Sequence, residues 1–282
     1  MSPAAEGLVL VDKPSGMTSH DVVDVVRRTL GTRKVGHAGT LDPMATGLLI
    51  LGAGRATRLL RYLGDLPKSY TGTARLGIET DTLDADGEVV RMSPVTSTRE
   101  DVVSAASALV GESMQAPPAY SAVKVGGRKL YEAARKGEAL EASPRAIRVD
   151  AFEVTAFDGA GFGFAVTCSG GTYVRALVAD VGRALGCGAH LTALRRTAIG
   201  PFRVEDARPP EDADPQPIER AVAHLPRLPL EPEEARAASH GRALGPAAIE
   251  GPYAVFDPDG TLIGIYRDEG AMARPEVILA SD

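Results

Sequence analysis

The feature that most constrains the fold of this 282-residue chain is a proline-rich, acidic segment late in the sequence. Residues 207–217 hold four prolines and three acidic residues. Proline lacks a backbone N–H and interrupts helices and inner strands, so this composition is typical of an exposed connection between domains. We therefore expect one domain over residues 1–215 and a second over residues 225–282.

The first part of the chain mixes predicted strands and helices. Apolar runs bounded by turn residues predict strands at residues 7–11, 48–51, 69–76, 87–91, 147–157, 162–169 and 191–199. The predicted helices start at two capping boxes, Thr18 with Asp21 and Thr98 with Asp101, and also cover residues 55–63 and 172–185.

Two further stretches have a pattern of their own. Residues 115–145 are basic and polar and contain a Pro-Pro and a Gly-Gly pair, which predicts a surface insertion with a helix near 130–135. After the proline-rich segment, a helix is expected near 231–239, with short strands at 253–256, 262–266 and 277–280. The second domain is therefore predicted to be small and mostly β.

The net charge of −6, taken alone, argues against a nucleic-acid-binding protein. The charge is unevenly spread, however. Residues 1–200 hold 23 Lys and Arg against 21 Asp and Glu, whereas residues 201–282 hold 8 against 16. The basic side chains of residues 25–63 and 124–148 are candidates for phosphate contacts; solvated helix faces are the alternative interpretation.

Several classes of protein are disfavoured by what the sequence lacks. Cys168, Cys187 and the five histidines show no metal-ligand spacing. Residues 52–57 carry only two of the three glycines of a dinucleotide fingerprint. The first apolar run is too short for a secretion signal, and no stretch is long enough to cross a membrane. We expect a cytoplasmic protein without metal, cofactor, membrane contact or obligate protein partner.

The segment best suited to chemistry is residues 36–47, a predicted loop rich in Gly and Thr that carries one carboxylate, Asp42. Asp42 is the only acidic residue between Asp24 and Asp65, and arginines lie on both sides of it. Positive neighbours lower the pKa of a carboxyl group, so we expect Asp42 to stay ionised and to act as nucleophile, general base or electrostatic stabiliser. An ordinary Asp-Pro turn is the alternative.

Residues 39–49, GTLDPMATGLL, closely resemble the catalytic motif of the TruB family, the bacterial tRNA pseudouridine-55 synthases. Five other segments resemble family motifs in family order across about residues 7–200. They are VDKPSGMTS at 11–19, SY at 69–70 with ARLG at 74–77 and TDT at 80–82, QAPPAYSAVK at 115–124, CSGGTYVR at 168–175 and LRRT at 194–197. Six ordered motifs are far more specific than one.

The resemblance implies an α+β pseudouridine-synthase fold: a mixed, mainly antiparallel sheet with flanking helices, followed by a small β-rich PUA-like domain. It implies isomerisation of uridine to pseudouridine at position 55, in the T-loop of tRNA, without a cofactor. Asp42 is then the nucleophile, attacking either the base or the sugar. A target base in a folded T-arm is stacked, so the enzyme must flip it out.

The same resemblance assigns six residues to substrate binding. Arg175 is the partner that keeps Asp42 charged and oriented. Tyr70 offers a flat ring to the base and a hydroxyl for proton transfer, and Tyr173 and Leu194 line the base pocket. Lys13 is expected to line it too, and His37 to fill the space that the extruded nucleotide leaves. Two alternatives stay open: a synthase acting on another RNA, and a non-catalytic tRNA-folding chaperone, which would not need Asp42.

Overall fold

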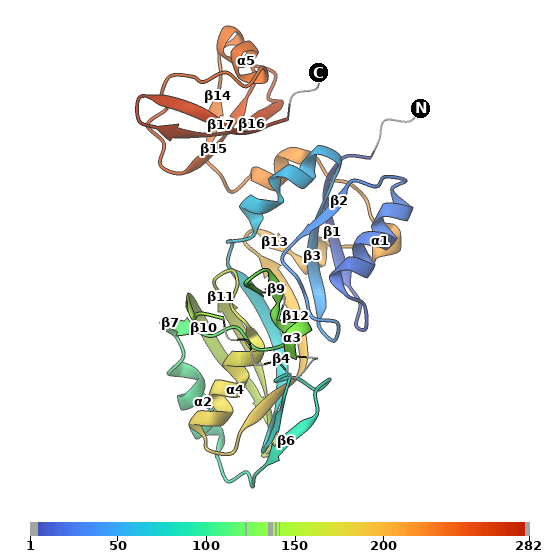
Figure 1. Cartoon of the computed structure of the whole chain (residues 1–282), viewed down its shortest axis with the longest axis vertical. Helices are drawn as coiled ribbons and strands as arrows, with labels where there is room; N and C mark the ends of the chain where they lie inside the picture. The colour runs from blue at the N-terminus through green and yellow to red at the C-terminus, as the bar shows by residue number, and fades with distance from the viewer. Residues whose placement is uncertain (1–4, 122, 135–137, 139, 141, 280–282) are drawn as a thin grey trace.

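The structure is a computed structural model that describes residues 5–121, 123–134, 138, 140 and 142–279. The described residues form a nine-stranded sheet, a four-stranded sheet and two small ribbons of two strands each (Figure 1). Within this part of the chain, no helix is both long and apolar enough to cross a membrane. The predicted α+β class is confirmed.

The nine-stranded sheet carries the loops that matter for function. Its strands are β1 (Gly7–Lys13), β2 (Val35–Ala38), β3 (Thr46–Ala53), β4 (Lys68–Leu76), β7 (Gly111–Gln115), β10 (Arg145–Phe157), β11 (Gly161–Cys168), β12 (Ala189–Ile199) and β13 (Phe202–Arg203). The order is β1-β3-β12-β4-β11-β10-β7, with β2 paired to β3 and β13 to β12. Of the pairings described in this sheet, β3 with β12 is parallel and the others are antiparallel, so the sheet is mixed and mainly antiparallel, as predicted.

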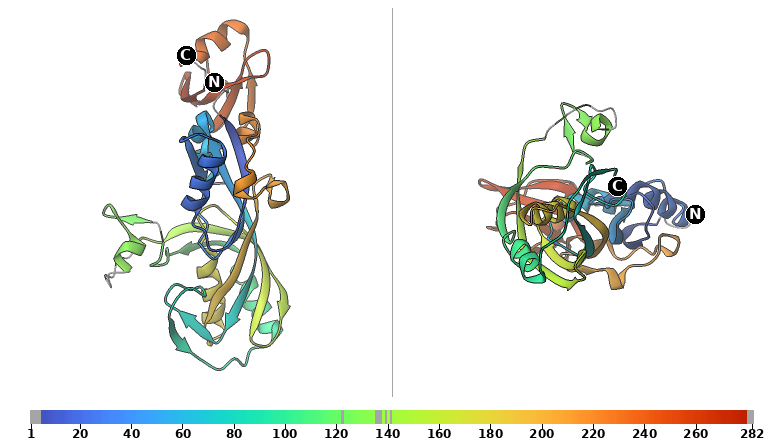
Figure 2. Two further views of the ribbon diagram at one scale, coloured as in Figure 1. Left: turned by 90° about the vertical axis from the view of Figure 1, so that its right-hand side faces the viewer. Right: turned by 90° about the horizontal axis from the view of Figure 1, so that it is seen from below.

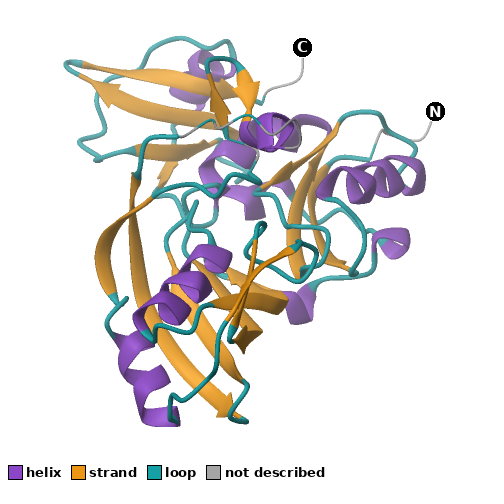
Figure 3. Ribbon diagram, turned by 60° about the horizontal axis from the view of Figure 1, so that its bottom comes forward, coloured by secondary structure: helices purple, strands orange, loops and turns teal. Residues whose placement is uncertain are grey.

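Helices cover the large sheet and close its cores. Helices α2 (Arg99–Ser107) and α4 (Val174–Ala184) pack into one apolar core with β4, β10, β11 and β12 (Figures 1 and 3). Helix α1 (Ser19–Thr29) places three buried valines against β1 and β3. Both predicted capping boxes are present, at the starts of α1 and α2. The sequence therefore marks these helix starts correctly.

The helix expected over residues 55–63 is a 3-10 helix, η1 (Gly54–Leu63), rather than an α-helix. It begins where its backbone packs directly on Gly52: a Cβ atom at Gly52 would lie 2.8 Å from the Ala56 carbonyl oxygen. Runs of 3-10 helix longer than three or four residues are uncommon, so this ten-residue element is an unusual one. Shorter 3-10 segments are η2 (Val204–Asp206), η3 (Pro210–Asp212) and η4 (Ile218–Val222).

The proline-rich segment 207–217 is largely exposed, as its composition predicts, but it is not a free linker. It lies along β1: Leu8 N donates to Gln216 O at 3.0 Å, and Gln216 N donates back to Leu8 O at 2.7 Å. Arg208 makes a matching pair of hydrogen bonds farther along the strand. The edge of a sheet has unpaired backbone groups that need partners, and an extended proline-rich chain supplies them here.

The four-stranded sheet lies in the last part of the chain, in the order β14-β15-β16-β17. Its elements are β14 (Arg227–Pro229), α5 (Pro232–Ser239), β15 (Pro252–Phe256), β16 (Leu262–Glu269) and β17 (Met272–Ile278). The last strand was predicted at 277–280 but begins at Met272, because a tight turn at Gly270, with φ of +64°, folds β17 directly back on β16. Ala280 lies outside the described residues.

The 3-10 helix η1 joins the two sheets. Its arginines Arg55 and Arg58 donate to the carbonyl oxygens of Leu279 and Ile278, and Arg61 forms an ion pair with Glu276 at 2.9 Å. Apolar residues of η1, β1, β3, β15, β16 and β17 share one core. The small sheet is therefore attached at the end of the large one, away from β4 and α4 (Figure 1).

The insertion predicted at 115–145 projects sideways from the body of the molecule (Figure 2). It contains the ribbon β8 (Lys124–Val125) and β9 (Arg128–Lys129) and the short helix α3 (Leu130–Ala134). The helix expected near 130–135 is therefore present as far as Ala134, whereas Arg135 and Lys136 lie outside the described residues. The second ribbon, β5 (Ile78–Thr80) with β6 (Val89–Met92), carries the loop 81–88.

Candidate active site

The Asp42 loop connects β2 to β3, and these two strands pair with each other and so hold both ends of the loop. The predicted loop 36–47 is thus shorter in the structure, because β2 reaches Ala38 and β3 starts at Thr46. Inside the loop, Ser19 Oγ accepts from Leu41 N at 2.9 Å, and Ala45 N donates to Asp42 O at 3.1 Å. These hydrogen bonds on both sides of Asp42 fix where its side chain points.

Gly47, the second residue of β3, lies just after the loop at a position that requires glycine. Its φ is +99°, and a Cβ atom there would lie 2.3 Å from the carbonyl oxygen of Arg196 on β12. Only glycine permits both this conformation and this close approach. The loop is therefore pressed against β12, the strand that also carries Leu194.

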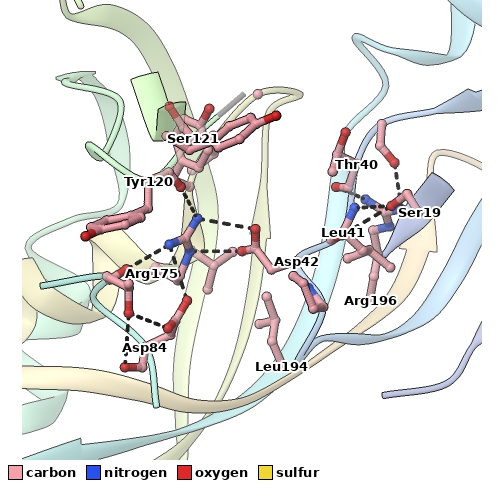
Figure 4. A pocket seen from close by; sticks show the side chains of 18 of the residues that line it. Ser19, Thr40, Leu41, Asp42, Asp84, Tyr120, Ser121, Arg175, Leu194 and Arg196 are labelled. Carbon is pink, nitrogen blue, oxygen red and sulfur yellow. Dashed lines mark hydrogen bonds and ion pairs between the residues drawn. The ribbon is translucent and has the colours of Figure 1, made fainter. Parts of the chain in front are cut away.

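Asp42 meets Arg175 as the resemblance implies. Arg175 Nε lies 2.9 Å from Asp42 Oδ2, and Arg175 Nη2 donates to Asp42 Oδ1 at 3.3 Å (Figure 4). The Arg175 side chain is 4% exposed, while that of Asp42 is 35% exposed. A buried guanidinium that meets both carboxylate oxygens favours the ionised form and fixes its orientation.

A second carboxylate, Asp84, shares Arg175 and was missed at the sequence level. Arg175 Nη1 lies 3.3 Å from Asp84 Oδ2, and Asp84 Oδ1 accepts from Thr82 Oγ1 at 2.5 Å. Arg175 also donates to the backbone oxygens of Thr82 and Tyr120. Asp84 follows the TDT motif at 80–82 by two residues, and this nearness to a family motif is the signal that could have identified it.

The loop that presents Asp84 has a left-handed residue at its centre. Leu83 has φ of +65°, a conformation that costs a non-glycine residue on the order of 1 kcal/mol. Its backbone oxygen accepts from Leu191 N at 3.0 Å, which ties the loop to β12. This turn sends both the Thr82 carbonyl and the Asp84 carboxylate toward Arg175.

The expectation that positive neighbours lower the pKa of Asp42 is wrong. Burial is the largest influence and raises this pKa, the charge of Arg175 lowers it, and the charge of Asp84 raises it again. The net effect is a pKa above the ordinary aspartate value. Asp42 is isolated from other acids in sequence but not in space, and the folded loop removes it from much of the water.

Asp42 and Arg175 line a pocket of about 1120 Å³. Tyr70, Tyr173 and Leu194 line the same pocket, so the structure brings together five of the seven predicted site residues. Leu194 is 8% and Tyr70 7% exposed. Figure 4 shows the Leu194 side chain next to that of Asp42.

The two tyrosines of the pocket are held in different ways. Tyr70 lies on β4, and burial raises the pKa of its phenol while the charge of Arg196 opposes that shift. Tyr173 precedes α4, and its backbone N–H and C=O both bond to the side chain of Gln115, at 2.8 and 3.1 Å. Its ring lies 4.7 Å from the guanidinium carbon of Arg145. Gln115 begins the QAPP motif and is a supporting residue that the sequence analysis did not single out.

Lys13 and His37 do not line the pocket, contrary to the prediction for Lys13. The Lys13 side chain is fully buried, and its ammonium group donates to the carbonyl oxygens of Pro14, Met17 and Pro43. It supports the Asp42 loop through the Pro43 carbonyl, from a position opposite Gly47 in the β1–β3 register. His37 lies on β2 with its ring edge-on to that of His20, 5.9 Å between centroids, and His20 lines the pocket.

The basic side chains of residues 25–63 differ in what engages them, and Arg27 pairs with Asp24 at 2.9 Å. Arg55, Arg58 and Arg61 face the four-stranded sheet and are engaged there, so they are not available as the phosphate contacts we expected of them. Arg33 and Lys34 are exposed between α1 and β2. Among the described residues, no group of three or more His, Cys, Asp or Glu side chains is arranged to hold a metal ion.

Comparison with known proteins is consistent along the whole chain. The profile described as "TruB family pseudouridylate synthase (N terminal domain)" matches residues 27–174. The profiles "tRNA pseudouridylate synthase B C-terminal domain" and "tRNA Pseudouridine synthase II, C terminal" match residues 175–212 and 225–280. The site residues Asp42, Tyr70 and Tyr173 lie within the first match, and Arg175 and Leu194 within the second.

Individual relatives agree with the profiles. A protein named tRNA pseudouridine synthase B from Mycobacterium sp. (strain KMS) is 49% identical over 284 residues, which cover 97% of this chain and 96% of that protein. One of the same name from Mycobacterium bovis (strain BCG / Pasteur 1173P2) is 45% identical over 293 residues, covering 99% and 97%. A solved chain from a Cbf5-Nop10-Gar1 complex is similar with a TM-score of 0.74 and 26% identity, over 96% of this chain and 84% of that one.

Proposed function

Because the chain belongs to the TruB family of pseudouridylate synthases, we propose that it isomerises the uridine at position 55, in the T-loop of tRNA, to pseudouridine. The base is flipped out of the RNA, and Asp42 is the nucleophile. The observation that carries this proposal is the Asp42 carboxylate in the pocket, partly exposed and 2.9 Å from the buried Arg175. The tRNA substrate is what the names of the relatives indicate.

The reaction is a rearrangement in which atoms and electrons balance without a cofactor. The bond between uracil N1 and ribose C1′ breaks, the base turns, and a bond forms between C5 and C1′. The proton on C5 is lost and N1 gains one. A carboxylate serves this sequence by adding to the sugar or to the base and leaving again, and either route needs Asp42 ionised. Arg175 supplies the opposite charge that keeps it so.

The rest of the pocket fits a flat, neutral base. Tyr70 and Leu194 are nearly buried at its wall, and a phenol whose pKa is raised by burial stays neutral at pH 7. We assign to Tyr70 stacking on the base and a part in proton transfer. Tyr173, clamped by Gln115, closes the pocket near Arg175. We propose that His37, whose ring packs on that of His20, fills the space that the flipped nucleotide leaves in the RNA.

Binding of the T-arm has to offset the flipping cost of a few kcal/mol. Contacts to phosphates can do so, and the exposed Arg33 and Lys34 and the projecting insertion are positioned for them. We propose that residues 1–215, including the insertion, form the catalytic domain. Residues 225–282 form a PUA-like domain whose net acidity leaves it a minor part in phosphate contact.

The position is tested with tRNA transcripts that carry tritium at C5 of every uridine. The wild-type protein should release tritium from one uridine per tRNA and none from a matched transcript whose residue 55 is cytidine. Equal release from the two transcripts would show that another uridine is the target. A T-arm minihelix, tested beside the full tRNA, shows how much of the substrate is needed.

The two alternatives predict different results in the same assay. A non-catalytic tRNA-folding chaperone releases no tritium from any tRNA, although it binds tRNA normally. A synthase for another RNA releases no tritium from either tRNA transcript but does release it from a labelled pool of other cellular RNA. Either result would overturn the proposed substrate, and the first would also overturn the proposed chemistry.

A further inference from the structure

Arg196, on β12, is the largest fully buried side chain of the described residues, at 1% exposure. Its guanidinium donates to three backbone carbonyls: Nε to Leu48 O at 2.7 Å, Nη2 to Gly39 O at 3.2 Å and Nη1 to Thr40 O at 3.4 Å. In the described part of the chain, no ion pair joins it to a carboxylate. The charge is therefore held by dipoles alone.

Burying a charge in this way is costly. A buried guanidinium without a carboxylate loses much of its hydration energy, and an apolar side chain of similar volume is often more stabilising. Arg196 is thus not explained by stability of the β-sheet. Its three acceptors suggest another role, because Gly39 and Thr40 immediately precede Leu41 and Asp42, while Leu48 follows the loop on β3.

Arg196 also reaches the base pocket. It lies opposite Tyr70 in the β12–β4 register, and both residues line the pocket that holds Asp42. The charge of Arg196 acts on the Tyr70 phenol and opposes the rise in its pKa that burial causes. A Cβ atom at Gly39 would lie 3.7 Å from Arg196 Nη1, so the loop backbone rests directly on the guanidinium.

Two buried lysines surround the same loop and are held in the same way. Lys13 donates to three carbonyls and Lys68 to the carbonyls of Gly64 and Leu66. Burial, together with the charge of Arg196, lowers the pKa of each to about 8. Of the two lysines, Lys13 binds the loop backbone, at the Pro43 carbonyl, while Lys68 binds carbonyls outside the loop. The Asp42 carboxylate itself faces Arg175.

We propose that Arg196 is a positioning residue for the isomerisation: it clamps both ends of the Asp42 loop through three carbonyls and presents a positive charge to Tyr70. The inference rests on the proposed function. Arg196 is almost fully buried, so we assign it no contact with the phosphates of the RNA. Its contribution therefore belongs to the chemical step, by fixing Asp42 within reach of the flipped nucleotide and by placing charge where the reaction needs it.

The test compares three variants in single-turnover tritium release at saturating enzyme, with tRNA binding measured separately. Arg196→Gln should lower the rate by on the order of 100-fold, the effect of losing one preorganised electrostatic group, with the Kd for tRNA unchanged. Arg196→Lys keeps the charge and should recover part of that loss. The matched control is Arg195→Gln, on the same strand, whose partly exposed guanidinium pairs with Asp12 instead; it should keep the wild-type rate.

A purely structural role predicts another pattern. It is indicated if Arg196→Gln weakens tRNA binding as much as it slows the reaction, or if Arg196→Lys is as slow as Arg196→Gln; either result overturns the proposal. If Arg196→Gln does not fold, judged by circular dichroism, the folded Arg196→Lys decides: a wild-type rate contradicts the three-carbonyl clamp, and a reduced rate at unchanged Kd supports it. Wild-type release in the same series shows separately whether the proposed function holds.

Discussion

Arg175 and Arg196 lie on opposite sides of the Asp42 loop, and the protein holds them by different means. Arg175, from α4, meets two carboxylates, Asp42 and Asp84, as well as two backbone carbonyls. Arg196, from β12, meets backbone carbonyls only. The first contact sets the charge and orientation of the Asp42 carboxylate, and the second sets the path of the backbone that carries it.

The difference has a physical consequence for the charge balance. Burial raises the pKa of Asp42, the charge of Arg175 lowers it, and the charge of Asp84, which shares that arginine, raises it again. Arg196 and the buried lysines give the other side of the loop an excess of positive charge. Substitutions on the Arg175 side should therefore change the chemistry of Asp42, and those at the periphery should change RNA binding.

The largest expected effect on the Arg175 side comes from Arg175→Lys. A lysine keeps the charge but cannot meet both oxygens of Asp42 and the Asp84 carboxylate with one planar group. We expect single-turnover tritium release to fall by on the order of 100- to 1000-fold, with tRNA binding retained. Arg183→Lys, on the exposed face of the same helix, is the control. If Arg175→Lys is as fast as the control, the contact of Arg175 with both oxygens of Asp42 is not needed for the reaction.

Asp84→Asn should have a smaller effect. The amide keeps the shape and can still accept from Thr82, but Arg175 loses one of its two negative partners and is free to turn. Loss of a group that orients a metal ligand costs about 10- to 100-fold in activity at metal sites, and we expect a loss of that order here. The single-turnover rate measures it, and Asp180→Asn, on α4, serves as control. A rate equal to wild type would mean that Asp84 only stabilises the loop.

Substitution of the exposed basic residues far from Asp42 should change the affinity for tRNA and leave the single-turnover rate unchanged. The double variant Arg33→Gln/Lys34→Gln removes two exposed charges, so the slope of log Kd against log salt should fall by about 1 to 2. Arg61→Gln removes a charge that is engaged by Glu276 and should leave the slope unchanged. Filter binding of tRNA over a salt series measures both. The opposite ranking would place the RNA on the η1 side of the molecule.

The acidic limb of the pH–rate profile should shift in opposite directions in the variants Asp84→Asn and Arg175→Gln. The reaction needs the ionised carboxylate, so the rate falls as pH drops through the pKa of Asp42, which lies above the ordinary aspartate range. Asp84→Asn removes a charge that raises this pKa and should move the acidic limb to lower pH. Arg175→Gln removes a charge that lowers it and should move the limb to higher pH. Single-turnover rates across an acidic pH series give both midpoints, and shifts of the same sign would contradict this arrangement of charges.

Much of the site could be predicted from the sequence because its residues lie in short motifs. Asp42, Tyr70, Tyr173, Arg175 and Leu194 meet at one pocket although they come from four distant stretches of chain. The mainly antiparallel sheet and the helix caps were also predicted correctly, since capping boxes and apolar runs are local signals. The catalytic roles of these residues stay predictions.

What the sequence could not give depends on contacts between distant segments. Asp42 has no acidic neighbour within 17 residues in sequence, yet Asp84 reaches the same guanidinium, so the expected direction of its pKa shift was wrong. Lys13 lies in a motif, but its side chain turns to backbone carbonyls beneath the loop. The η1 arginines and the segment 207–217 were interpreted from their composition. In the structure, Glu276 and Ile278 of β17 engage Arg61 and Arg58, and the β1 backbone engages residues 208 and 216.

The central claim is that the Asp42 carboxylate carries out the isomerisation, and Asp42→Asn tests it most directly. The amide has nearly the same shape and cannot act as a nucleophile or carry the charge that Arg175 binds. Single-turnover release of C5 tritium from tRNA, measured beside tRNA affinity, gives both answers in one preparation. If Asp42 is the nucleophile, Asp42→Asn gives no detectable release at an unchanged Kd. Release at the wild-type rate by a folded Asp42→Asn protein would contradict it.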